Sequence, residues 1–124
     1  MHQVPLLING EFIQSTSNEL IDVVNPANQE VLAQVPCATD AEMDAAIASA
    51  SETFKTWKDV PITERARIMM KYAALLKENH DELATIICHE LGKTFEDAKG
   101  DVWRGIEVVE QAANAPSLMM GETM

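Results

Sequence analysis

The chain has 124 residues and a formal net charge of −11, from 20 acidic and 9 basic side chains. Its length suits one domain, and its acidity argues against nucleic acid or an anionic membrane as a partner, because phosphate binding needs clustered Lys and Arg. No run of about 18 apolar residues predicts a membrane-spanning helix. Two cysteines do not make a disulfide framework, so we expect a reducing compartment: the cytoplasm, with the mitochondrial matrix left open.

Residues 1–37 predict a small β meander. A tight hairpin is indicated at Asn9-Gly10, between two short apolar runs, because both residues accept positive φ. A later strand ends at Asn25-Pro26, since the residue before proline is pushed out of the helical region. The expected strands are 6–8, 11–13, 21–24 and 31–35.

From Thr39 onward the hydrophobic period changes to 3.6, which predicts four helices. Thr39 with Glu42 is a capping-box signature. Gly92 is placed to end the third helix in the left-handed conformation, and Thr94 can cap the fourth. The expected helices are 40–57, 62–78, 80–91 and 94–113, within a helical segment 38–115 that is followed by a tail, 116–124.

Each helix carries an apolar stripe, and we expect the four stripes to form a mutual core. A fresh cap by Asn79, with Glu82 three residues on, is expected to start the third helix. The stripe residues are Met43, Ala46, Ile47, Ala50, Phe54 and Trp57 in the first helix, Ile62, Ala66, Met69, Ala73 and Leu76 in the second, and Phe95, Ala98, Val102, Ile106, Val109 and Ala113 in the fourth.

Reactive or ligating side chains are few. Cys88 adjoins two isoleucines and Cys37 lies at a strand-to-helix turn, and a structural role is favoured for both. His80 is expected at an exposed helix start. His89 lacks the second histidine of a zinc helix motif, because Lys93 stands in its place. We therefore expect no metal site.

Arg104 stands out because Gly100 and Gly105 flank it in the fourth helix. Each mid-helix glycine costs about 1 kcal/mol relative to alanine, which suggests that a backbone or a ligand channel approaches closely. A guanidinium fork suits a carboxylate ligand. The alternative, favoured by the residues alone, is that Arg104 pairs with Asp101 or Glu107 and that the glycines serve helix packing.

Several motifs resemble the amino-terminal part of the aldehyde dehydrogenase superfamily. They are Leu7-Ile8-Asn9-Gly10-Glu11-Phe12, Val24-Asn25-Pro26-Ala27 and Thr63-Glu64-Arg65-Ala66-Arg67-Ile68. A longer run resembles the acylating methylmalonate-semialdehyde dehydrogenases, also described as malonate-semialdehyde dehydrogenases. It comprises Glu90-Leu91-Gly92-Lys93-Thr94, the segment 97–110, and Pro116-Ser117-Leu118-Met119-Met120-Gly121-Glu122.

The resemblance implies an α/β fold in which residues 1–124 are the amino-terminal part of the NAD-binding domain. It implies an NAD-dependent, CoA-acylating oxidoreductase, working as a homo-oligomer in valine or inositol catabolism. In that family a cysteine thiolate attacks a carboxylated semialdehyde, and the products are propionyl-CoA or acetyl-CoA, CO2 and NADH. An arginine matching Arg104 holds the substrate carboxylate, which makes substrate binding the favoured role of this residue.

The family's catalytic cysteine, oxyanion-hole asparagine and NAD-contacting residues lie beyond position 124, and the resemblance matches neither Cys37 nor Cys88 to the nucleophile. We therefore expect an inactive amino-terminal fragment that lacks the catalytic domain and binds neither NAD nor CoA. The alternative is a non-catalytic helical scaffold or protein-interaction module, which should show an extra exposed apolar helix face. Malonate and methylmalonate semialdehyde are not distinguished.

Overall fold

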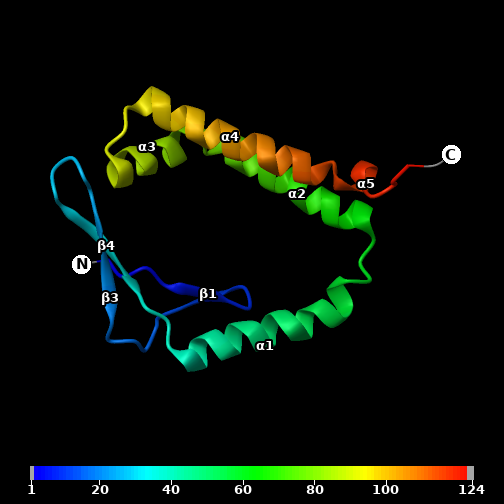
Figure 1. Ribbon diagram of the computed structural model, residues 1–124, viewed down its shortest axis with the longest axis horizontal. Helices are drawn as coiled ribbons and strands as arrows, with labels where there is room; N and C mark the ends of the chain where they lie inside the picture. The colour runs from blue at the N-terminus through cyan, green and yellow to red at the C-terminus, as the bar shows by residue number, and fades with distance from the viewer. Residues whose placement is uncertain (1, 123–124) are drawn as a thin grey trace. The chain divides into compact units, whose positions relative to one another are not determined.

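The computed structural model describes residues 2–122 (Figure 1). Where the length predicts one domain, the contacts divide the chain into two compact units, Met1–Asp59 and Val60–Met124. No helix within the described range is long and apolar enough to cross a membrane.

The first unit begins with two antiparallel strand pairs that form separate sheets. Strands β1 (Leu6–Ile8) and β2 (Glu11–Ile13) make the predicted hairpin, and Asn9 and Gly10 have φ of 54° and 78°. Strands β3 (Leu20–Val24) and β4 (Val31–Pro36) pair with an irregularity near the end of β3. The predicted strands are confirmed to within one residue at each end.

Helix α1 (Asp40–Trp57) starts at the predicted capping box. The Thr39 N–H donates to Glu42 Oε2 at 2.8 Å, and the Glu42 N–H donates to Thr39 Oγ1 at 3.3 Å. Glu42 also accepts from the Thr16 N–H at 2.7 Å and from Ser15 Oγ at 2.9 Å. The backbone donors of Thr16 and then Thr39 lower the pKa of Glu42 from 4.5 to about 2. One carboxylate thus ties the loop after β2 to the start of α1.

The apolar stripe of α1 does not join a core, so the prediction of a mutual core is wrong for this helix. No residue of α1 is buried, and Met43, Ile47 and Phe54 are more than half exposed. The reason is that only the short β1–β2 hairpin offers apolar surface beside the stripe. Helix and hairpin line an open groove of about 470 Å³ whose apolar members include Leu7 and Trp57.

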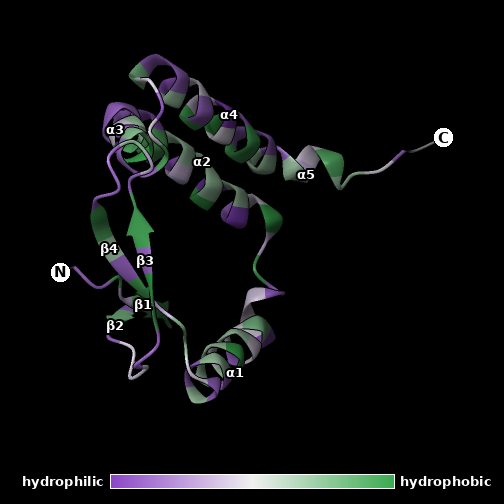
Figure 2. Cartoon of the chain, turned by 60° about the vertical axis from the view of Figure 1, so that its left-hand side comes forward, coloured by the Kyte–Doolittle hydropathy of each residue, from purple (hydrophilic) through white to green (hydrophobic). Residues whose placement is uncertain are grey.

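The second unit is helical, and its core lies among α2 (Ile62–Glu78), α3 (His80–Leu91) and α4 (Phe95–Ala113). Hydrophobic and hydrophilic residues alternate along α4 (Figure 2), as expected for a helix with one apolar stripe. The fully buried core residues are Ala84, Ala98 and Ile106, with Val102 almost so, and the partly buried residues packed on them are Leu76, Leu83, Ile87 and Cys88.

The predicted stripes of α2 and α4 are largely confirmed. Ala66 and Ala73 are buried on α2, and four residues of the α4 stripe are buried. Phe95 is the exception: it is 40% exposed, because it lies in the first turn of α4 beyond the reach of the core. Small alanines at the contacts allow the helices to pack closely.

Of the four predicted helix-end signals, the capping box at Thr39 and two others are confirmed. Gly92 has φ of 66° and ends α3, and Thr94 Oγ1 accepts from the Asp97 N–H at 3.4 Å. The predicted cap by Asn79 is wrong: its Nδ2 donates back to the Leu75 carbonyl at 2.8 Å, at the end of α2.

The predicted tail contains a short fifth helix, α5 (Ala115–Leu118). Pro116 lies in its first turn, where proline is tolerated because the N–H has no intrahelical partner there. Residues 123 and 124 of the predicted tail lie outside the described residues.

We expect Glu42→Gln to weaken the first unit at neutral pH and to flatten its acid sensitivity. Because the folded pKa of Glu42 is lowered, its contribution is full above pH 4.5 and is lost as the pH falls toward about 2. Trp57 is the one tryptophan of the first unit, so urea unfolding followed by its fluorescence in a Trp103→Phe background measures the effect. Glu52→Gln, on the exposed side of α1, is the matched control; equal acid profiles for the two variants would contradict the role of Glu42.

We also expect the 124-residue chain to self-associate, because it exposes large apolar side chains in both units. Phe12, Val108 and Met120 are each at least 70% exposed. Sedimentation velocity over a range of concentrations should show a rising average mass, and the double variant Ile47→Lys, Phe54→Lys should reduce it. A chain that stays monomeric at every concentration would show that this exposed surface drives no association.

Candidate functional site

A charged face of α4, formed by Lys93, Asp97, Asp101 and Arg104, contains the residue predicted to bind substrate. Asp97, Asp101 and Arg104 are spaced by four and three residues, which places them on one side of the helix. Lys93 precedes the cap of α4, between the glycine that ends α3 and the threonine that starts α4. The short α3–α4 junction therefore brings a lysine next to the first turns of α4.

Asp101 bridges the two cations of the charged face. Its Oδ1 accepts from Arg104 Nη2, and its Oδ2 accepts from Lys93 Nζ. Lys93 Nζ also lies 2.8 Å from Asp97 Oδ2. The Arg104 side chain is 68% exposed, whereas Asp101 and Lys93 are 28% and 26% exposed. The guanidinium is thus held from the protein side and open to solvent on the other.

The electrostatics of the charged face favour the ionised forms of these groups. The hydrogen bond from Lys93, followed by that from Arg104, lowers the pKa of the Asp101 carboxyl. Asp101, followed by Asp97, raises the pKa of the Lys93 ammonium. A cation near a helix amino terminus is disfavoured by the helix dipole, so the two carboxylates compensate for the placement of Lys93.

The structure shows which acidic side chain pairs with Arg104 and what surrounds its two glycines. Arg104 pairs with Asp101, whereas Glu107 accepts from Trp103 Nε1 at 3.1 Å. A Cβ at Gly105 would meet nothing within 4 Å, and one at Gly100 would meet only Arg104 Nη1, at 4.0 Å. Within the described residues, neither glycine is required by a close approach or by helix packing.

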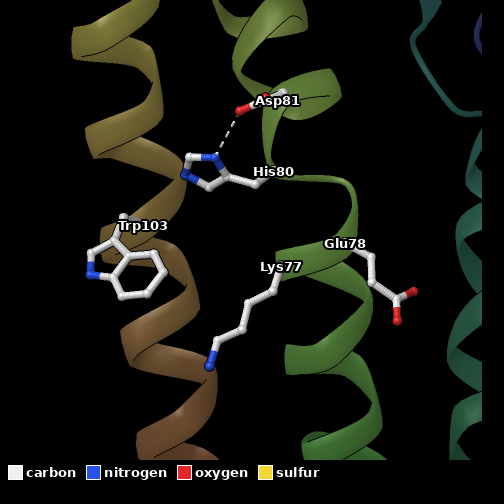
Figure 3. A pocket seen from close by; sticks show the side chains of 5 residues that line it. All are labelled: Lys77, Glu78, His80, Asp81 and Trp103. Atoms are coloured by element: carbon white, nitrogen blue, oxygen red, sulfur yellow. Dashed lines mark hydrogen bonds and ion pairs between the residues drawn. The ribbon is translucent and has the colours of Figure 1, made fainter.

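A second group of polar residues lines an open groove of about 360 Å³ beside α4, comprising Lys77, Glu78, His80, Asp81 and Trp103 (Figure 3). His80 Nδ1 lies 3.3 Å from Asp81 Oδ1, and Nε2 lies 3.1 Å from the Lys99 carbonyl oxygen. The imidazole meets the Trp103 ring edge to face, with centroids 6.4 Å apart.

The expectation of an exposed His80 is therefore wrong. Its side chain is only 20% exposed, because α3 begins directly after α2 and directs the imidazole toward α4. The groove has no Ser, Thr or Cys in its lining that His80 could activate.

The described residues contain two free thiols but no cluster of metal ligands. Cys37 and Cys88 are free and half-buried, and Cys88 packs against the core. Between residues 2 and 122, no three His, Cys, Asp or Glu side chains converge as metal ligands. Dinucleotide binding in α/β proteins uses parallel strands and a glycine-rich turn, whereas both strand pairs here are antiparallel. The described strand pairs therefore do not form a dinucleotide site of that kind.

Residues 12–124 match the aldehyde dehydrogenase family. The chain belongs to the aldehyde dehydrogenase family. It is 51% identical over 121 residues to the human mitochondrial methylmalonate-semialdehyde/malonate-semialdehyde dehydrogenase [acylating], covering 98% of this chain and 23% of that protein. It is 47% identical over 117 residues to malonate-semialdehyde dehydrogenase 1 of Geobacillus kaustophilus, covering 94% of this chain and 24% of that protein.

Solved aldehyde dehydrogenase structures agree with this assignment. Methylmalonate-semialdehyde dehydrogenase from Oceanimonas doudoroffii aligns with a TM-score of 0.91 and 38% identity, over 98% of this chain and 25% of that one. A Sinorhizobium meliloti protein described as a methylmalonate-semialdehyde dehydrogenase, complexed with NAD, aligns at 0.89 and 39%, over 95% of this chain and 24% of that one. This aldehyde dehydrogenase chain spans a quarter or less of the relatives it matches.

Sequence reasoning named Asp101 only as an alternative partner of Arg104 and gave Lys93 no role. The signal was present, because Lys93, Asp97 and Asp101 follow one another at intervals of four residues. The spacing was missed because Gly92 ends α3 just before Lys93, so Lys93 was not counted with the residues of α4.

We expect the pKa of Asp101 to lie below 3.8 and to rise in Lys93→Met, because the hydrogen bond from Lys93 is the largest cause of its lowering. Carboxyl-carbon NMR titration of the 124-residue chain measures this pKa directly. Lys99 lies on α4 and contacts Asp81 instead of Asp101. Lys99→Met also removes one positive charge, so it should leave the titration of Asp101 unchanged. An Asp101 pKa that does not move in Lys93→Met would refute the bridge.

Proposed function

We propose that this chain forms the amino-terminal segment of an NAD-dependent, CoA-acylating dehydrogenase of malonate or methylmalonate semialdehyde. The products would be acetyl-CoA or propionyl-CoA, CO2 and NADH. The observation that carries the proposal is the identity of 47–51% to dehydrogenases with these substrates in their names, from mammals, an amoeba and bacilli, over at least 94% of the chain.

In this proposal Arg104 binds the carboxylate of the semialdehyde. Its guanidinium is exposed, and Asp101 occupies only Nη2, which leaves donors for a second carboxylate. The planar fork matches two carboxylate oxygens, and a site that hydrogen-bonds the substrate carboxylate discriminates against aldehydes that lack it.

In this proposal the cofactor sites and the cysteine nucleophile belong to other parts of a complete dehydrogenase, since both described strand pairs are antiparallel and dinucleotide binding in α/β proteins uses parallel strands. The 124 residues would then be part of its NAD-binding domain and inactive alone. The complete enzyme would be a homo-oligomer. It would work in a reducing compartment, since both cysteines are free.

One observation favours the alternative of a protein-interaction module. The stripe of α1, with Met43, Ile47 and Phe54, is an exposed apolar helix face of the kind such a module should show. The relatives are about four times longer than this chain. In the dehydrogenase proposal, the remainder of the enzyme would cover the same face.

The deciding experiment is turnover of malonate semialdehyde by the complete dehydrogenase with NAD, in the presence and absence of CoA. NADH formation that requires CoA and yields acetyl-CoA supports the proposal. Release of free malonate without any need for CoA, or no turnover, contradicts it. The 124-residue chain assayed in parallel should form no NADH.

We expect Arg104→Lys in the complete enzyme to raise KM for malonate semialdehyde about 10- to 100-fold, because it keeps the charge but removes the fork. Propanal has no carboxylate, so its KM should stay unchanged. Arg67→Lys, at an exposed position on α2, is the control. Equal losses for both aldehydes would show that Arg104 does not recognise the carboxylate.

A further inference from the structure

Lys93 has no assigned role, yet it is the second cation of the charged face on α4. Its side chain is 26% exposed, and both of its acidic partners belong to α4. One of these partners, Asp101, also holds Arg104. Lys93 and Arg104 are therefore linked through a single carboxylate, with one oxygen for each cation.

We propose that Lys93 is a specificity-determining residue that acts through Asp101 to keep Arg104 attractive to a carboxylated substrate. The inference rests on the proposed function of Arg104 and adds a residue to that site.

Asp101 competes with the substrate carboxylate for Arg104. Asp101 is three residues from Arg104 on the same helix, so it is a permanent rival of any incoming carboxylate. A carboxylate that already accepts from a second cation draws less strongly on the guanidinium. Lys93 therefore weakens the hold of Asp101 on Arg104 and leaves the outer donors of Arg104 free for substrate.

Lys93 also balances the charge of this helix face. Lys93 and Arg104 balance Asp97 and Asp101, so the four side chains together are neutral. Without Lys93, Asp97 and Asp101 would leave this face of the helix with a net negative charge, and Asp101 would have Arg104 as its one remaining cationic partner on that face. An anionic substrate would then meet repulsion at the residue that should bind it. An uncharged aldehyde would not be affected.

The test compares Lys93→Met, Lys93→Arg and Lys99→Met in the complete dehydrogenase, with malonate semialdehyde and propanal as alternative substrates. Lys93→Met should lower kcat/KM for malonate semialdehyde roughly fivefold relative to propanal, the scale of one partly exposed charge interaction. The loss should appear in KM and should shrink at 1 M salt, because exposed charges are screened there. Lys93→Arg should restore most of the selectivity.

Lys99→Met removes one positive charge from α4, and Lys99 contacts Asp81 and Phe95 instead of the charged face. The selectivity of this variant should therefore equal that of the wild type. A Lys93→Met variant that behaves like Lys99→Met, or that loses activity equally with both aldehydes, overturns the inference. The two proposals are separable in the same assay. Loss of selectivity in Arg104→Lys but not in Lys93→Met overturns only the role of Lys93, whereas no selective loss in Arg104→Lys overturns the proposed function of the site.

Discussion

The buried stripe of α4 is the constraint on which the site depends. Ala98, Val102 and Ile106 pack among α2 and α3 and fix the rotation of α4 about its axis. Because an α-helix has 3.6 residues per turn, burying this stripe places Arg104 on the opposite side of the helix and Asp101 on the flank between them. The exposure of the guanidinium is thus set by the core, and a change in core packing would rotate Arg104 away from its present direction.

On that exposed side, ion pairs rather than burial hold the side chains of the site in place. Arg104 is tethered to the helix by Asp101 but is not covered by it, and Lys93 reaches Asp101 from the α3–α4 junction. A lone arginine on a helix surface would sample many rotamers, and ordering them on binding costs free energy. Pairing with a carboxylate three residues earlier removes part of that cost in advance. The arrangement suits recognition of a small anion by a limited number of directional donors.

The sequence predicted the elements well because their signals are local. The capping box at Thr39, the left-handed Gly92 and the 3.6-residue period each act within a few residues, so the helix bounds followed from them. The failures concern choices made by tertiary contacts. Asn79 could cap α3 or close α2, and the imidazole of His80 could face solvent or Trp103; neither choice is encoded within one turn. The exposed stripe of α1 was missed for the same reason, since periodicity shows that a face is apolar but not what covers it.

The central claim is that Arg104 receives the carboxylate of a semialdehyde, and a crystal structure of the complete dehydrogenase with bound malonate tests it most directly. The account predicts a malonate carboxylate within hydrogen-bond distance of the Arg104 guanidinium, while Asp101 still accepts from Lys93. Malonate bound elsewhere, with Arg104 paired only to Asp101, would contradict it.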